Sequence, residues 1–216
     1  MKTKITTTFI AIALMFIAGV TKAQDAKYTS AMQTGLQQFN DAKSGADYLA
    51  VANHFERVGT IAKVEWLPYY YAAYSQLINN TTVTNTDEKD AVLDKALDLI
   101  AKAEAINPQE SEIFALKGYL AFMKIYVNPM ARMQAGMGTA TTYIEKAKAM
   151  NPNNPRPYFI LAQNTFYTPE AFGGGKKAAK TKLEEAAKKF EDFKPVNELM
   201  PDWGKERNAS LLSECQ

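Results

Sequence analysis

A run of three glycines followed by two lysines is the part of this sequence with the clearest potential for binding chemistry. It comprises Gly173, Gly174, Gly175, Lys176 and Lys177. Free backbone N–H groups at the start of a following helix can hold a phosphate or a carboxylate, and the lysines would add positive charge. The run is not a Walker A loop, which requires Gly-Lys-Ser/Thr. The pattern favours a tight turn that needs positive backbone angles, with an anion site as the alternative hypothesis.

Tyrosine is the second residue type that indicates binding. Aromatic residues are dense in several apolar segments, and most of them must form core. We expect a minority, namely Tyr70, Tyr74, Tyr126 and Tyr167, to face a groove. A tyrosine ring joins a large apolar area to a polar tip, which suits a surface that holds a peptide or another ring. These four side chains are therefore candidate ligand- or partner-binding residues.

Metal and nucleophilic chemistry have little support in the sequence. Met130, Met133 and Met137 follow helical spacing and could bind Cu(I), but a methionine stripe is far more often pliable core. His54 is the sole histidine, and no Gly-x-Ser-x-Gly phrase offers it a nucleophile. The sequence thus predicts no catalytic residue, no metal site and no cofactor, in a protein that is not an enzyme.

Charge and cysteine content exclude further classes of protein. The 216 residues include 25 Lys and Arg against 23 Asp and Glu, a balance that argues against nucleic acid as a partner. With one histidine and one cysteine, a single chain cannot build a His/Cys zinc site or an internal disulfide. Cys215 is expected to be buried or, as the alternative, to pair with another chain.

Residues 1–23 have the features of a cleavable signal peptide. Two lysines near the start precede an uncharged apolar stretch over residues 5–20, and small residues at Thr21 and Ala23 mark a cleavage site. An uncleaved anchor is the alternative, but the stretch is short for a span, which needs about 20 apolar residues. Val20 stands where a lipidated cysteine would be required. We expect a periplasmic or secreted protein with no stable membrane insertion after cleavage.

Prolines recur at nearly regular intervals along the rest of the chain. Pro68, Pro108, Pro152 and Pro195 lie 40, 44 and 43 residues apart. Proline ends helices because it lacks an N–H donor and restricts the residue before it. Apolar residues at helical spacing fill the intervals, and a period of this size is typical of a helical solenoid. The expected helices are residues 26–43, 46–63, 67–79, 88–106, 110–127, 129–150, 155–167, 175–193 and 203–214.

The phrases LDKALDLIAKAEAINP (93–108) and TTYIEKAKAMNP (141–152) resemble the tetratricopeptide repeat (TPR) superfamily over roughly residues 26–195. Residues 153–195 are more particularly similar to exported TPR-like proteins of Bacteroidota and, more distantly, to the T component of TRAP transporters. The resemblance implies an all-α, right-handed solenoid of about four helix pairs plus a C-terminal capping helix. We expect one domain over residues 24–216, with units at about 26–66, 67–108, 109–152 and 153–195 and a cap over 196–216.

The expected function is that of a non-catalytic periplasmic adaptor or scaffold that holds a segment of another protein in its concave groove. The reason is a fold built around an extended surface, in a sequence without a catalytic constellation. The alternative is a small-ligand-binding or transporter-accessory protein whose ligand is anionic or aromatic. A wide open groove would favour the adaptor, whereas a deep pocket lined by tyrosine with one or two charges would favour the ligand-binding protein.

Overall fold

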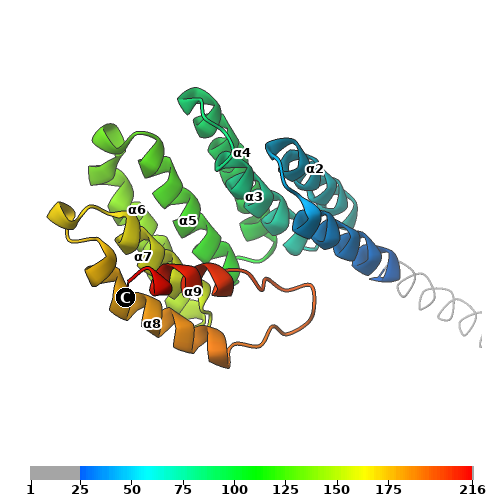
Figure 1. The fold of residues 1–216 in the computed structure, drawn as a ribbon. Helices are drawn as coiled ribbons and strands as arrows, with labels where there is room; N and C mark the ends of the chain where they lie inside the picture. The colour runs from blue at the N-terminus through cyan, green and yellow to red at the C-terminus, as the bar shows by residue number, and fades with distance from the viewer. Residues whose placement is uncertain (1–24, 216) are drawn as a thin grey trace, which may run out of the picture.

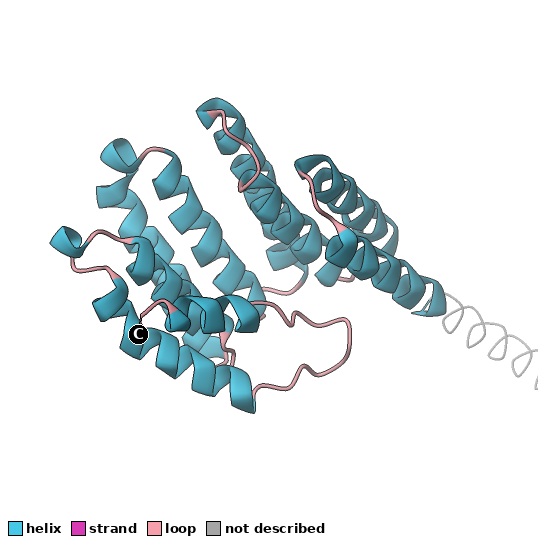
Figure 2. Cartoon of the chain, viewed as in Figure 1, coloured by secondary structure: helices cyan, strands magenta, loops and turns pink. Residues whose placement is uncertain are grey.

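The computed structural model describes residues 25–215, and all regular secondary structure in that range is helical (Figures 1 and 2). The all-α class is therefore confirmed, and each helix predicted from the sequence overlaps an observed one. The predicted signal peptide lies outside the described residues. A first helix over residues 25–41 is followed by α2 (Gly45–Ala62), α3 (Leu67–Asn80), α4 (Thr86–Ile106), α5 (Ser111–Val127), α6 (Pro129–Met150), α7 (Arg156–Tyr167), the 3-10 turn η1 (Glu170–Phe172), α8 (Lys176–Asp192) and α9 (Lys205–Ser213). Within residues 25–215, no helix is both long and apolar enough to cross a bilayer.

Short polar phrases determine where the helices begin and end. Ser44 and Asp47 form a reciprocal capping box at the start of α2. Asn85 caps α4 and Asn128 caps α6, and each side chain accepts a hydrogen bond from a backbone N–H of the first turn. The two repeated Asn-Pro phrases end α4 and α6, because proline cannot continue a helix.

Each helix from α2 to α8 packs against the next one along the chain, and α5 also contacts α3 and α7. This makes α5 the central element of the packing. Ile113 and Leu116 contribute to the core that α5 shares with α2, α3 and α4, whereas Phe114 and Phe122 belong to a second core with α6, α7 and α8. A helix that is apolar on nearly all faces is expected to lie between neighbours on both sides, as α5 does.

A buried ion pair joins the first turns of α5 and α7. Arg156 Nε lies 2.5 Å from Glu112 Oε2, and Arg156 Nη2 lies 2.5 Å from Glu112 Oε1. The two residues are 0% and 3% exposed. Burial acts to lower the pKa of Arg156, but the Glu112 carboxylate outweighs it, so the net change is upward and the guanidinium stays charged. Removing both charges from water costs free energy, and the two hydrogen bonds of the bidentate contact offset that cost.

Replacing Glu112 by Gln should leave a buried guanidinium without its counter-charge and lower the free energy of unfolding by about 3–5 kcal/mol. The control is Glu145→Gln, which removes a pair with Lys148 at the surface of α6 and should cost about 0.5 kcal/mol or less. Urea denaturation followed by circular dichroism measures both losses. Equal losses would contradict a special role for the buried pair.

Candidate functional site

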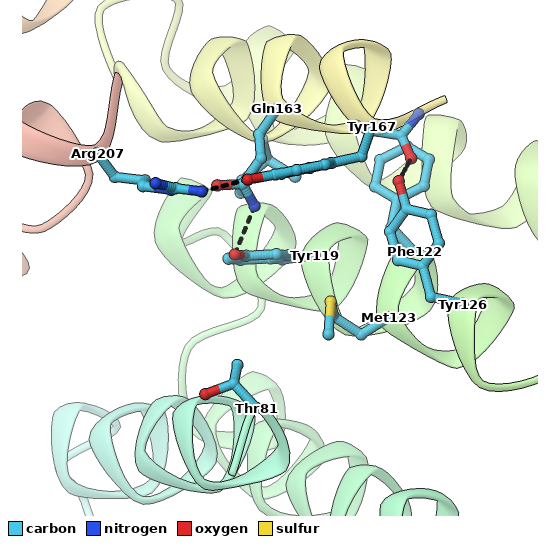
Figure 3. Close-up of a pocket in the computed structure, with 10 residues that line it drawn as sticks. Thr81, Tyr119, Phe122, Met123, Tyr126, Gln163, Tyr167 and Arg207 are labelled. Carbon is cyan, nitrogen blue, oxygen red and sulfur yellow. Dashed lines mark hydrogen bonds between the residues drawn. The ribbon is translucent and has the colours of Figure 1, made fainter. Parts of the chain in front are cut away.

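A cavity of about 470 Å³ lies between the end of α3 and helices α5, α7 and α9 (Figure 3). This volume falls within the range of small-molecule sites, about 300–1,000 Å³. Tyr126 and Tyr167 are 39% and 49% exposed, so solvent reaches the lining. The lining is mainly aromatic and apolar, with two amides and one arginine: Thr81, Tyr119, Phe122, Met123, Tyr126, Ile160, Gln163, Asn164, Tyr167 and Arg207.

Two helices supply most of the wall, and they do so with the same spacing. The residues of α5 are 119, 122, 123 and 126, and those of α7 are 160, 163, 164 and 167. Positions i, i+3, i+4 and i+7 share one face of a helix, so each helix presents one stripe to the cavity. Sequence reasoning identified Tyr126 and Tyr167 and missed the other lining residues. The identical spacing in two units of the repeat was the available signal.

The register between the two walls follows the repeat. Gln163 Nε2 donates a hydrogen bond to Tyr119 OH at 2.6 Å, across a separation of 44 residues. Glu112 and Arg156 are also 44 residues apart. The same number separates the two Asn-Pro phrases in the sequence. One repeat length therefore places corresponding residues of α5 and α7 side by side, both in the buried pair and in the cavity.

The hydroxyl groups of the three cavity tyrosines are engaged by protein groups. Tyr126 OH donates to Asn164 Oδ1 at 2.7 Å, and Tyr167 OH accepts a hydrogen bond from Arg207. The Tyr119 hydroxyl accepts the hydrogen bond from Gln163 Nε2. Burial raises the pKa of Tyr119 and raises that of Tyr126 to about 12. Both of these phenols stay protonated at neutral pH, and the cavity tyrosines offer a ligand chiefly the faces of their rings.

Arg207 is the only charged residue among the described residues that line the cavity. It is the third residue of α9, which begins after Gly204 in a left-handed conformation with φ 107°. Asn208 anchors this helix, because its side-chain Nδ2 donates to the Leu183 carbonyl of α8 at 3.0 Å. The guanidinium is thereby held at one end of the cavity, where it donates to Tyr167 OH (Figure 3).

Residues 193–204, which we call the C-terminal strap, run from α8 to α9 (Figure 1). The ring of Trp203 stacks on Tyr74 with centroids 4.7 Å apart, and its Nε1 donates to Tyr70 OH at 2.9 Å. The Tyr71 hydroxyl, also on α3, donates a further hydrogen bond to the Leu199 carbonyl at 2.8 Å. The strap therefore packs against the helix that carries two of the predicted groove residues.

Tyr70 and Tyr74 are consequently 0% and 8% exposed and do not face an open groove. The prediction that they lie at a ligand- or partner-binding surface is wrong, because they lie in the core under the strap. The periodicity of α3 shows which residues share a face, but it gives no information about a segment much later in the chain that covers that face.

The arrangement of the chain is similar to that of the HusA haemophore from Porphyromonas gingivalis, a bacterium of the Bacteroidota. The TM-score is 0.76 and the sequence identity 29%, over 88% of this chain and 92% of that one. No protein-family model matches the chain, and no curated protein does. The likeness to HusA fits the predicted similarity to exported proteins of Bacteroidota. The similarity to TPR proteins and to the T component of TRAP transporters stays a prediction.

The glycine run forms the turn between η1 and α8, and none of its residues lines the cavity. Gly173 and Gly175 have φ of 79° and 90°. The N–H groups of all three glycines donate to backbone carbonyls of the preceding segment. Lys176 Nζ lies 3.8 Å from a carboxylate oxygen of Glu214, and Lys177 is exposed. The turn accounts for the glycines, and their N–H groups are not free to hold an anion.

Replacing Gly174 by Ala should lower the free energy of unfolding by about 2 kcal/mol or more, because its Cβ would lie 2.1 Å from the Thr168 carbonyl oxygen. Gly138→Ala is the matched control. Gly138 lies within α6 with nothing within 4 Å of an added Cβ, so alanine should stabilise the helix by about 0.5–1 kcal/mol. Urea denaturation distinguishes the two variants, and a neutral Gly174→Ala would contradict the tight turn.

The remaining candidates from the sequence lie outside the cavity. His54 Nε2 is 2.9 Å from a backbone carbonyl of the first helix. Met133 and Met137 pack against the second core as expected, whereas Met130 is exposed. Cys215 is half-buried against the same core. Within residues 25–215, no cluster of three or more His, Cys, Asp or Glu side chains is arranged to hold a metal ion.

Proposed function

We propose that this chain is a non-catalytic carrier that binds haem, or a flat tetrapyrrole like it, in the cavity between α3, α5, α7 and α9. One observation carries the proposal: the chain is similar over most of its length to a protein described as a haemophore, and it has an aromatic-walled cavity of ligand size. The proposal corresponds to the small-ligand alternative in the sequence analysis rather than to the adaptor.

The chemistry of the cavity supports a flat, largely apolar cargo. Tyr119, Tyr126 and Tyr167 present rings from two facing helices, and the adjoining ring of Phe122 is buried. Each ring that stacks on a planar ligand contributes about 0.5–1.5 kcal/mol beyond the burial of its area. Met123 adds an adaptable thioether side chain between the rings. A macrocycle with apolar faces would use all of these contacts together.

The described lining residues offer the iron of haem only weak axial ligands. Histidine is not among them, since His54 packs elsewhere. Ligation by tyrosine needs a phenolate, which the raised pKa values of Tyr119 and Tyr126 disfavour. Met123 could supply a thioether. We therefore expect the macrocycle to provide most of the affinity, so that a porphyrin without iron binds comparably to haem.

The proposal also includes the solenoid fold, the localisation and the non-catalytic role, which follow from the sequence patterns. The helices form a right-handed TPR-like solenoid in one domain over residues 24–216, with α3, α5 and α7 as its inner helices. A signal peptide directs the chain to the periplasm or outside the cell, where a haemophore works. The absence of a catalytic constellation in the sequence supports a binding protein over an enzyme.

The adaptor function retains less support than the carrier. A partner segment along the whole predicted groove would contact Tyr70 and Tyr74 as well as Tyr126 and Tyr167, and the strap already covers the first two through Trp203. Binding such a segment would require displacement of the stacked indole and its hydrogen bond. The cavity proposed for the ligand needs no such displacement, because Tyr126 and Tyr167 are exposed in the structure.

Titration with haemin and with protoporphyrin IX should quench the fluorescence of Trp203, whose ring lies 6.2 Å from the ring of Tyr119. A Trp66→Phe background leaves Trp203 as the single reporter. Tyr167→Ala should weaken the binding of both porphyrins about tenfold or more, because it removes one aromatic wall.

Tyr158→Ala is the matched control for this titration. Tyr158 lies on the same helix, and its hydroxyl contacts the Pro152 carbonyl rather than the cavity. The affinity of this variant should change by less than about twofold. If neither porphyrin binds, or if the two tyrosine variants lose affinity equally, the proposed site is wrong.

A further inference from the structure

We propose that Arg207 is a specificity-determining residue that pairs with a carboxylate of the cargo. The cavity then selects a flat apolar molecule that carries an acid group at one end. This inference rests on the proposed function and deepens it, because it names the chemical group that the polar end of the site recognises.

The first support is that the charge of Arg207 has no carboxylate partner among residues 25–215. Arg132 pairs with Asp90, and Arg156 pairs with Glu112. Among the described residues, no carboxylate lies within 4 Å of the Arg207 guanidinium, although the side chain is held at the cavity. The described residues that line the cavity include no acidic side chain that would repel an incoming anion.

The second support is the direction in which the guanidinium is held. Its hydrogen bond to Tyr167 OH uses one of the five N–H donors of arginine, and the residue is exposed, so further donors remain available. Arginine recognises carboxylates through two parallel hydrogen bonds. Figure 3 shows Arg207 at one end of the group of ring side chains and Tyr126 at the other. A ligand stacked on the rings would present its acid group at the Arg207 end.

The third support is that the surroundings strengthen the pairing. The guanidinium donates to the Tyr167 hydroxyl at the edge of a mainly aromatic and apolar lining. Apolar surroundings lower the local dielectric and increase the attraction between opposite charges. An ion pair at an exposed surface contributes little to affinity, whereas one against an apolar wall contributes more. The charge of Arg207 already acts across the cavity, since it opposes the rise in the pKa of Tyr119 that burial causes.

The test compares protoporphyrin IX with its dimethyl ester, which has the same ring and no free carboxylate. The unmodified protein should bind the diacid about tenfold more tightly than the ester. Arg207→Gln should lose that preference by weakening the diacid about tenfold while leaving the ester unchanged. Lys205→Gln is the matched control, because it removes a charge two residues earlier on α9 at a position outside the cavity lining, and it should keep the preference.

The outcomes separate this inference from the proposed function. Equal affinity of the unmodified protein for diacid and ester overturns the carboxylate pairing and leaves the carrier in place. Binding of neither compound overturns both. If Arg207→Gln weakens diacid and ester alike, the guanidinium acts on the ring or on the fold, and the pairing is wrong. The comparison of the diacid with the ester on the unmodified protein needs no variant. It therefore tests the carboxylate pairing even if Arg207→Gln does not fold.

Discussion

Glu112 and Arg156 meet at the first turns of α5 and α7, and this contact holds the two helices in a fixed register. Neither charge has access to water, so the pair requires its bidentate geometry, and any sliding of one helix past the other would separate two buried charges. The cavity lies further along the same two helices. The register set by the ion pair is the one that places Tyr119 beside Gln163.

The same guanidinium also contacts the strap. The Arg156 guanidinium carbon lies 4.6 Å from the ring centroid of Phe193 and 5.8 Å from that of Trp203. These cation–π contacts hold the strap against the first turn of α7, and the strap leads directly into α9. Arg156 therefore contacts Trp203, and the chain leads from Trp203 into α9, which carries Arg207 to the cavity.

The two arginines illustrate how one residue type serves two purposes. Arg156 is enclosed, paired and part of the framework. Arg207 is exposed, lacks a carboxylate partner among the described residues and lies beside aromatic rings. Pairing with Glu112 neutralises the charge of the first guanidinium, and we infer that pairing with the cargo neutralises the second. Composition alone does not distinguish them, because the distinction depends on which helix ends lie next to one another.

The sequence by itself determined the helices, since their signals are local. Proline stops, asparagine caps and apolar residues at helical spacing act within a few positions of one another, and the predicted boundaries agree with the observed helices to within a few residues. It also indicated a repeat near 44 residues, the spacing that sets the register of α5 against α7. Tyr126 and Tyr167 were predicted to face a groove because a tyrosine ring joins apolar area to a polar tip, and both line the cavity in the structure.

The tertiary structure alone decided which tyrosines are covered and which charge completes the cavity. Tyr70 and Tyr74 are covered by Trp203, and Arg207 reaches the cavity from α9. These contacts join residues some 40 to 130 positions apart, and no local pattern encodes them. They depend on the path of the strap across the other helices, which follows from the summed burial of its side chains and not from the propensity of any one segment.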